Sequence, residues 1–337
     1  MANTARWSFR RAIAAAALVF LGLPIAAAEP NVVVTLKPLH GLVAAVMEGV
    51  GTPHLLIDGA ASPHVYAMKP SEVRRLNTAD VIIRVSKRLE VFLVRPLSLL
   101  SKQSRIVTID DETPGLVHFN VRAGGDFEDH AHPAPNATNH RDHEHGASHA
   151  THGHDEPDHV GDRATRDPHL WLDPRNAKAI VVHLGRVLTE VYPSAAERLT
   201  SNVDAATRKL DALDAFLSEE MTSVAGRPFL VFHDAYQYFE HRYKLSGAGS
   251  VTVNAEVPPS ARRISEIRAR VARAGIVCIF AEPQFEPRVI TAIAEGLGVR
   301  QATLDPLGAS IAAGPGHYSA LMLGLARDLK GCLGTTG

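Results

Sequence analysis

Three histidines and one aspartate of this chain stand at positions suited to binding a metal ion. His233 comes directly after the apolar segment Phe229–Phe232, and Asp305 also follows a short apolar segment. His64 lies on an expected loop after a short strand, and His169 precedes a helical pattern. Three imidazoles and a carboxylate suit a borderline divalent cation, above all Zn²⁺ in tetrahedral geometry. More than 60 residues separate each candidate from the next, so the spacing alone is no zinc motif, and each histidine taken singly also fits an ordinary core or surface position.

Short β-branched segments alternate with helical patterns, and this alternation must position the four candidates. Such alternation is typical of parallel sheets whose faces are covered by helices. We therefore predict an α/β fold of two lobes, each with a mostly parallel sheet flanked by helices. The expected strands are 31–36, 54–57, 81–85, 106–110, 229–232, 251–254, 276–281 and 300–304, and the expected helices are 38–49, 89–100, 174–191, 236–243, 259–274, 287–297 and 317–329.

Residues 194–225 read as one long, rigid helix that joins the two lobes. Its leucines recur at helical spacing, and at 1.5 Å per residue it would reach about 48 Å. The expected division is an N-terminal lobe at 29–193 and a C-terminal lobe at 226–337. In open α/β sheets, ligands bind outside the carboxyl ends of the strands. Facing lobes would therefore bring His64 and His169 toward His233 and Asp305.

The first 28 residues have the pattern of a cleaved signal peptide. Three arginines precede the apolar segment Ala12–Leu23, and the small residues Ala26-Ala27-Ala28 fit a cleavage site near Ala28. The apolar segment is short for a membrane-spanning helix, although an N-terminal anchor is the alternative. The pair Arg10-Arg11 leaves the choice between general and twin-arginine export open. In the oxidising compartment that export implies, Cys278 and Cys332 can pair, or they can remain two buried thiols.

The composition narrows the class of partner. The 337 residues carry 35 basic and 36 acidic side chains, for a net charge of −1, which gives no support to nucleic-acid binding. Two cysteines exclude a disulfide-rich scaffold and a four-thiolate zinc site.

Half of the 18 histidines lie in the segment 126–162, which is also rich in Asp and Glu. It has too few apolar residues to offset the entropy of ordering, so we expect a flexible His-rich loop. The loop is either a secondary metal-capturing antenna or a solvated spacer. Its candidate ligands are His143, His145, His149, His152 and His154.

Five motifs of the chain resemble the periplasmic zinc-binding proteins of ABC importers, the ZnuA-like group. They occur in order over nearly all of the mature chain, and the one around His233 is the most specific. The resemblance includes the His-rich insertion ahead of the second ligand motif. The motifs are Ser62–Tyr66, Asp167–Pro174, Phe232–Glu240, Phe280–Phe285 and Thr303–Gly308.

The resemblance implies a ligand set and a disulfide. The metal histidines of the family fall on His64, His169 and His233, and its carboxylate position falls on Asp305. Some members carry a glutamate just before the first histidine that can complete the metal shell, whereas this chain has Pro63. The fourth ligand is therefore Asp305 or a water molecule. The cysteine pair of the family also resembles Cys278 and Cys332, which favours the disulfide over free thiols.

The function that the resemblance implies is capture of Zn²⁺ in the periplasm and its delivery to an ABC permease in the inner membrane. We expect a monomer that is not an enzyme and binds no nucleic acid. One alternative is a zinc hydrolase or lyase with Asp305 or Glu282 as general base, although no H-E-x-x-H motif or nucleophile elbow occurs. The other is a periplasmic zinc buffer that works without a transporter through its His-rich loop.

Overall fold

The computed structural model of the chain describes residues 30–100, 104–122, 166–252 and 257–334. The expected signal peptide at 1–28 lies outside these residues. So does the His-rich segment 126–162 with its five candidate ligands. Within the described residues, no helix combines the length and apolarity that a membrane crossing requires.

The first lobe is built on a four-stranded parallel sheet in the order β2–β1–β3–β4. The two central strands, β1 (Val32–Val34) and β3 (Val81–Arg84), consist mostly of valine and isoleucine and are fully buried. An unbroken β-branched segment is the pattern of a strand covered on both faces. The edge strands are β2 (His54–Leu55) and β4 (Arg105–Thr108).

The helices of this lobe differ from expectation in two places. The polar helix α2 (Pro70–Thr78) was not expected, because Leu76 is its one buried residue and the segment lacks an apolar stripe. The helix expected at 89–100 is divided into two short turns. Buried Glu90 accepts hydrogen bonds from the backbone N–H groups of Val85 and Ser86, which fixes a turn there and delays the helix start. The helical segments are α1 (Lys37–Val46), α2, η1 (Val91–Leu93), α3 (Val94–Ser98), α4 (Ile109–Glu112), η2 (Leu170–Leu172) and α6 (Pro174–Val191).

The second lobe repeats the architecture with a parallel sheet in the order β6–β5–β7–β8. The central strand β5 (Phe229–His233) is buried along its whole length, so its last residue is carried to the sheet's carboxyl edge inside the protein. The remaining elements are β6 (Gly247–Thr252), β7 (Cys278–Ala281), β8 (Arg300–Thr303), α8 (Gln237–Tyr243), α9 (Ala261–Arg273), α10 (Arg288–Ala294) and α11 (His317–Leu333). Two four-stranded parallel sheets flanked by helices confirm the predicted fold class.

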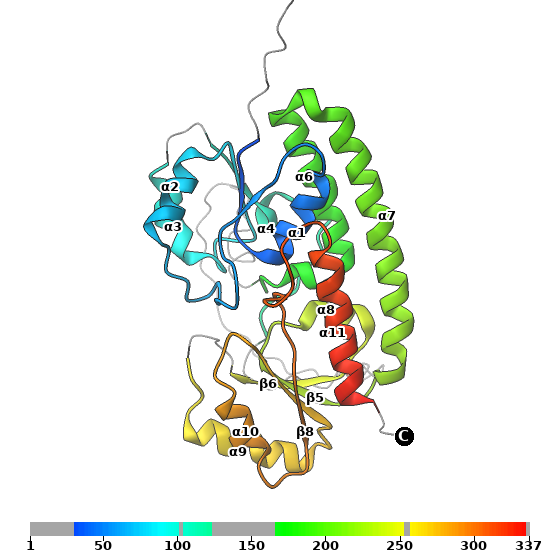
Figure 1. Ribbon diagram of the computed structural model, residues 1–337. Helices are drawn as coiled ribbons and strands as arrows, with labels where there is room; N and C mark the ends of the chain where they lie inside the picture. The colour runs from blue at the N-terminus through cyan, green and yellow to red at the C-terminus, as the bar shows by residue number, and fades with distance from the viewer. Residues whose placement is uncertain (1–29, 101–103, 123–165, 253–256, 335–337) are drawn as a thin grey trace, which may run out of the picture.

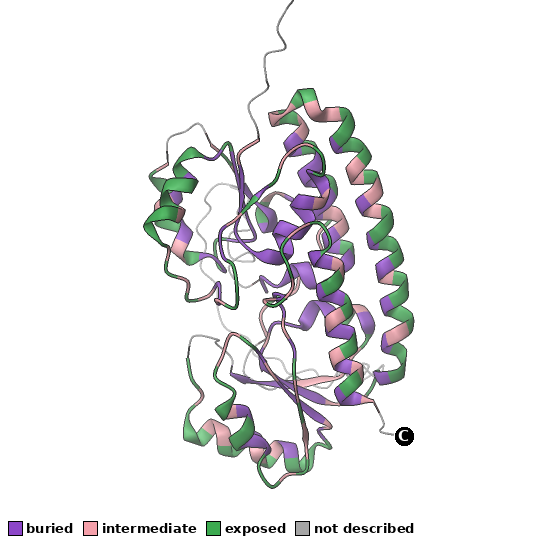
Figure 2. Ribbon diagram, viewed as in Figure 1, coloured by how far each residue is buried: buried purple, intermediate pink, exposed green. Residues whose placement is uncertain are grey.

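The long helix α7 (Ala196–Met221) runs beside both lobes, on the opposite side of the molecule from α2 and α9 (Figure 1). It is flanked by the short turns η3 (Pro193–Ala195) and η4 (Thr222–Val224), and the helix itself spans about 39 Å. Its buried residues face α6, α1 and α11, whereas its outer face is exposed (Figure 2). Helix α11, expected within the second lobe, packs against α1 of the first.

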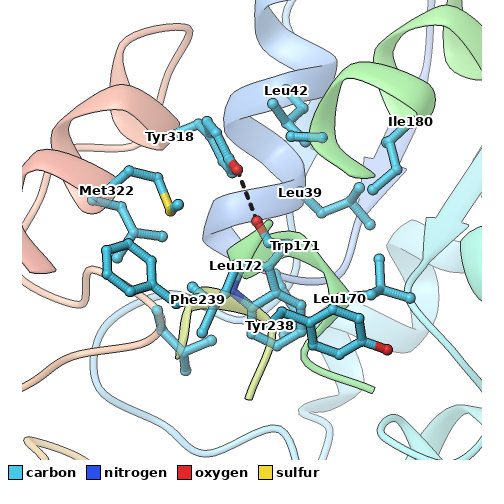
Figure 3. Close-up of a cluster of buried hydrophobic side chains, with 14 of the residues drawn as sticks. Leu39, Leu42, Leu170, Trp171, Leu172, Ile180, Tyr238, Phe239, Tyr318 and Met322 are labelled. Atoms are coloured by element: carbon cyan, nitrogen blue, oxygen red, sulfur yellow. Dashed lines mark hydrogen bonds between the residues drawn. The ribbon is translucent and has the colours of Figure 1, made fainter. Parts of the chain in front are cut away.

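An aromatic cluster joins the two lobes around Trp171 (Figure 3). The hydroxyl of Tyr318, on α11, donates to the backbone oxygen of Trp171 at 2.8 Å. The indole nitrogen of Trp171 donates to the backbone oxygen of Pro306 at 2.9 Å. Tyr238 and Phe239 from α8 pack into the same cluster. The core is therefore continuous between the lobes, and the segment that contains Trp171 is held from both sides.

A disulfide between Cys278 and Cys332 connects the start of β7 to the last turn of α11. Both residues are buried, and 54 positions separate them in the sequence. The expected disulfide is confirmed, and the alternative of two free thiols is wrong.

Candidate metal centre

His169 is fixed by an aspartate two residues earlier. The Oδ1 atom of Asp167 accepts hydrogen bonds from the backbone nitrogen of His169 at 3.0 Å and from its Nδ1 at 2.8 Å. Asp167 is itself held, because its backbone oxygen accepts from the hydroxyl of Tyr238 and its backbone nitrogen donates to Phe119. An imidazole that donates from Nδ1 leaves Nε2 as its free lone pair. The Nε2 atom of His169 is therefore a candidate ligand atom.

His233 is fixed in the same way by a carboxylate from the neighbouring strand. It ends β5, and the Oε1 atom of Glu282, just after β7, lies 2.8 Å from its Nδ1 and 3.2 Å from its backbone nitrogen. Both strands end at the same edge of the sheet because β5 and β7 are parallel neighbours. Metal-binding histidines usually donate their second ring N–H to such an acceptor.

His64 comes from the loop after β2. The hydroxyl oxygen of Ser62 accepts a hydrogen bond from the backbone nitrogen of His64 at 3.3 Å. The Nε2 atom of His64 is buried and has no hydrogen-bond partner among the described residues. An unpartnered buried imidazole nitrogen is unfavourable unless something binds to it, so His64 is a candidate ligand on physical grounds.

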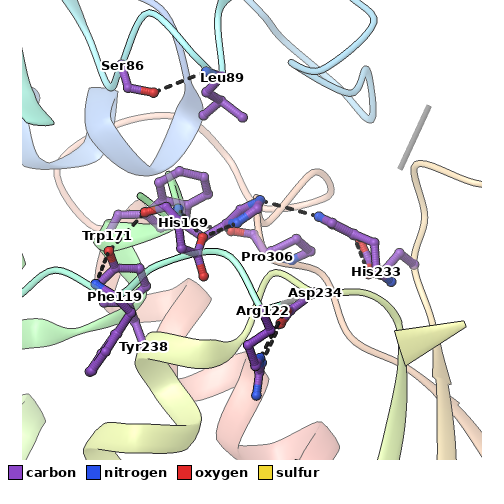
Figure 4. Close-up of polar contacts among 12 residues, drawn as sticks. Ser86, Leu89, Phe119, Arg122, His169, Trp171, His233, Asp234, Tyr238 and Pro306 are labelled. Carbon is purple, nitrogen blue, oxygen red and sulfur yellow. Dashed lines mark hydrogen bonds and ion pairs between the residues drawn. The ribbon is translucent and has the colours of Figure 1, made fainter. Parts of the chain in front are cut away.

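The three histidines converge on one point. One nitrogen from each lies within 4.8 Å of the others, and no other group of this kind occurs among the described residues. The Nε2 atoms of His169 and His233 are 3.3 Å apart and face each other (Figure 4). Two nitrogens bound at about 2.1 Å to a tetrahedral Zn²⁺ lie about 3.4 Å apart, so this spacing fits the ion. His64 and His169 come from the first lobe and His233 from the second.

The space at this point is small. A cavity of about 10 Å³ is lined by the three histidines together with Ser62, Pro63, Trp171, Glu282, Gln284, Phe285, Pro306 and Leu307. Such a volume holds about one water-sized sphere. The site therefore suits a single ion and excludes an organic ligand.

Burial and mutual repulsion keep two of the imidazoles neutral. Burial, together with the nearby His169 and His233, lowers the pKa of His64 to about 2. Burial and the nearby His233 also lower the pKa of His169 well below its usual value. Neutral imidazoles are the form that binds a metal, so these two histidines are ready for one at neutral pH.

Nearby carboxylates raise the pKa of His233, in contrast to the lowered pKa values of His64 and His169. Burial is again the largest single influence and lowers its pKa, but the charge and hydrogen bond of Glu282, with smaller effects of Asp234 and Asp167, raise it above 6.5 overall. Burial also raises the pKa of the Asp167 carboxyl to about 7. In the absence of metal, His233 therefore keeps its proton up to a higher pH than an ordinary histidine does.

Asp305, the expected carboxylate ligand, is not a member of the three-histidine cluster. Its Oδ1 accepts hydrogen bonds from Gln284 Nε2 at 2.8 Å and from the backbone nitrogen of Leu307 at 3.0 Å. Its Oδ2 accepts from the backbone nitrogen of Ala309 at 2.6 Å. Both carboxylate oxygens are therefore occupied by donors from the protein.

The residues that orient the ligands were identified only in part from the sequence. Glu282, at the end of a predicted strand, is a candidate from the sequence for orienting a ligand histidine, as are Asp234 and Glu256. Glu282 does orient His233. Asp234 instead forms an ion pair with Arg122 below the site (Figure 4), and Arg122 also pairs with Glu240. Glu256, the third residue considered for this role, lies outside the described residues. Asp167 was missed, although an Asp two residues before a histidine is a recognisable turn pattern.

The chain is similar to known proteins of zinc uptake. Residues 32–332 match the family described as the periplasmic component A of the zinc-uptake complex, ZnuA. The chain is 41% identical over 317 residues to the high-affinity zinc uptake system protein ZnuA of Brucella abortus (strain 2308), an alignment that covers 93% of this chain and 95% of that protein. It is 34% identical over 333 residues to the protein of the same name from Yersinia pestis, covering 99% and 100% of the two chains.

A solved structure shares the fold. The periplasmic zinc-binding protein TroA from Treponema pallidum superposes with a TM-score of 0.72 at 20% identity, over 91% of this chain and all of that one. At this identity the likeness concerns the fold alone. The family match over almost the whole described chain is the stronger finding, and by it this protein belongs to the ZnuA family of periplasmic zinc-uptake components.

Proposed function

We propose that this protein captures Zn²⁺ in the periplasm, at the contact between its two lobes, and delivers it to an ABC permease. The observation that carries the proposal is the convergence of His64 and His169 from one lobe with His233 from the other. A cation held by side chains from both lobes lies between them, and a small shift of one ligand-bearing segment opens its shell. The lobes are residues 29–193 and 226–337, joined through 194–225.

The protein is a zinc-binding component of an uptake system and not an enzyme. Its family consists of solute-binding proteins for zinc uptake, so the hydrolase or lyase considered above is wrong. A transport protein needs a site that fills and empties, whereas a zinc hydrolase needs an open metal position for its substrate. The cavity of about 10 Å³ is too small for an organic substrate beside the ion, which supports the first of these.

The proposed zinc shell contains the Nε2 atoms of His64, His169 and His233. The fourth position is filled by Asp305 or by a water molecule, because Pro63 offers no ligand atom there. Imidazole at position 233 is softer than a carboxylate and favours Zn²⁺ over Mn²⁺.

The family is periplasmic, and the finer details of location are part of the proposal. Residues 1–28 are a signal peptide cleaved near Ala28. The mature protein acts as a monomer that meets its permease in the inner membrane and binds no nucleic acid. The zinc ion is its cargo.

The ligand set is tested by zinc titration of His64→Ala, His169→Ala and His233→Ala. Each lost imidazole should lower zinc affinity by at least a hundredfold, because three ligands form nearly the whole shell. Competition with a chromophoric chelator measures the affinity. His54→Ala, an exposed histidine on β2, is the control and should bind like the wild type. Tight 1:1 binding in all three variants would place the site elsewhere.

The His-rich segment is proposed as a secondary, low-affinity zinc antenna. The residues that would act are His143, His145, His149, His152 and His154. A tethered ligand raises the local zinc concentration near the high-affinity site without needing high affinity of its own. Deletion of residues 127–161 should lower the zinc stoichiometry and slow zinc transfer from a weak chelator, while the tight site remains. Unchanged stoichiometry and transfer rate in stopped-flow measurements would identify the segment as a spacer.

A further inference from the structure

Gln284 lines the metal cavity together with the three histidines, and one atom of its side-chain amide has no hydrogen-bond partner among the described residues. It follows β7 and projects toward Asp305, to which its Nε2 donates a hydrogen bond at 2.8 Å. Its Oε1 is buried and has no hydrogen-bond partner among the described residues. A buried amide oxygen without a donor is unfavourable, so its presence at the edge of a binding cavity calls for a ligand.

The orientation of this amide follows from chemistry. An ionised carboxylate only accepts hydrogen bonds, so Asp305 requires the NH₂ group of Gln284 and directs the Oε1 atom away from itself. Asp305 is held in turn by the backbone nitrogens of Leu307 and Ala309. The amide oxygen therefore has a defined direction before any metal enters.

A zinc-bound water suits this oxygen chemically. Gln284 is one of the residues that line the cavity at the three histidines, and a water bound to Zn²⁺ is a strong hydrogen-bond donor. Three histidines fill three positions of a tetrahedral shell, and Pro63 cannot fill the fourth. The Oδ1 atom of Asp305 already accepts two hydrogen bonds and its Oδ2 accepts one, and Asp305 lies outside the three-histidine cluster.

We propose that Gln284 positions the fourth zinc ligand: its Oε1 accepts a hydrogen bond from a water that completes the shell, and Asp305 acts on the metal only by orienting the Gln284 amide. This inference rests on the proposed zinc site. It assigns to Gln284 a role in holding the cargo and makes Asp305 a positioning residue. Gln284 provides a neutral acceptor, so the shell of three imidazoles and a water carries no negative ligand.

Two substitutions separate this arrangement from direct binding by Asp305. Gln284→Leu removes the acceptor at similar volume and should lower zinc affinity about tenfold. Asp305→Asn keeps an oxygen that can accept from Gln284, so it should lower the affinity no more than Gln284→Leu does. Gln301→Leu, the same change at an exposed position on β8, is the control and should leave the affinity unchanged. Chelator competition measures all four proteins.

A larger loss of zinc affinity in Asp305→Asn than in Gln284→Leu would overturn the proposal. A neutral amide is a poor zinc ligand, so if Asp305 binds the metal directly, Asp305→Asn should lose at least a hundredfold and exceed the effect of Gln284→Leu. An affinity of Gln284→Leu within twofold of the wild type would also overturn it. If His64→Ala retained tight zinc binding, the zinc site itself would be wrong, which is a separate failure.

A crystal structure of the zinc-loaded wild type gives a readout that does not depend on the folding of any variant. The expected result is a water oxygen bound to the metal and within hydrogen-bond distance of Gln284 Oε1, with Asp305 still bonded to Gln284 Nε2. An Asp305 oxygen at bonding distance from the metal, with no water between them, would overturn the proposal.

Discussion

At the scale of single residues, two carboxylates control the proposed zinc site without belonging to the three-histidine cluster. Asp167 and Glu282 each accept from the Nδ1 atom of one histidine, which orients the ring and frees Nε2. They differ in their electrostatic consequences. Glu282 raises the pKa of His233, whereas the pKa of His169 stays low. The two imidazoles therefore respond differently to pH.

The pH dependence of zinc binding follows from these shifts. The proton on His233, whose pKa lies above 6.5, must leave before zinc binds, whereas His64 and His169 are already neutral. Asp167, with a pKa of about 7, adds at most a second proton. Below the pKa of His233 we expect zinc affinity to fall about ten- to a hundredfold per pH unit. Chelator competition between pH 8 and 5 measures how zinc affinity changes with pH. A slope that corresponds to the release of three protons would contradict the assignment of the pH dependence to His233 and Asp167.

Removing the Glu282 charge should shift the pH dependence of zinc affinity to lower pH. Glu282→Gln keeps an oxygen for His233 Nδ1 but takes away the charge that raises its pKa. The pKa of His233 should fall, and the loss of zinc affinity should begin at a lower pH. The affinity at pH 8 should drop about tenfold because the histidine loses a charged orienting partner. A midpoint that stays fixed or moves upward would show that another group sets the pH dependence.

At the scale of elements, parallel strands that end at one edge explain why residues distant in sequence meet. β5 and β7 deliver His233 and Glu282 to the same side of the second sheet. The helices must then hold the lobes in position, and α6 and α7 pack unusually closely to do so. A Cβ added at Gly185 of α6 would collide with Val203 of α7.

This close approach gives a test of the helix contact. Gly185→Ala should lower the free energy of unfolding by about 1–3 kcal/mol, because a methyl group at this contact forces the helices apart. Gly331→Ala is the matched control, since Gly331 lies in α11 with open space around its Cβ position. There the substitution should stabilise by about 0.5–1 kcal/mol through helix propensity. Urea unfolding measures both, and equal effects would show that the α6–α7 contact accommodates the methyl group.

At the scale of the whole molecule, the two lobes share one hydrophobic core. Its buried residues come from both sheets and from α7 and α11, and the Trp171 cluster lies between the lobes. Domains with a large apolar interface do not move freely relative to each other. Zinc binding and release should therefore involve small rearrangements around the site.

Small-angle scattering can test this expectation. The radii of gyration of the zinc-free and zinc-loaded protein should differ by less than about 1 Å, because wide opening would expose the shared core to water. The protein with residues 127–161 deleted is the appropriate sample, since it removes any contribution of the His-rich segment. A larger expansion on zinc removal would indicate a hinge motion that breaks the interlobe core.

Much of the fold and part of the site could be predicted from the sequence. Continuous β-branched segments such as the one in Val81–Arg84 predict the buried parallel strands, and a stripe of leucines predicts α7. Helix α2 has no such pattern, because nearly all of its residues are exposed. The three histidines were recognisable through their motifs, and the disulfide through the resemblance to a family.

What the sequence by itself determined is therefore the order of elements and the residue types at their ends, because local periodicity reports which faces are buried. Only the tertiary structure decided which groups share the cavity. It brings Asp167 and Glu282 to the ring nitrogens, engages both oxygens of Asp305 with protein donors and leaves the oxygen of Gln284 without one. Hydrogen-bond geometry between distant segments has no local signature, since it depends on how two lobes and a shared core pack together.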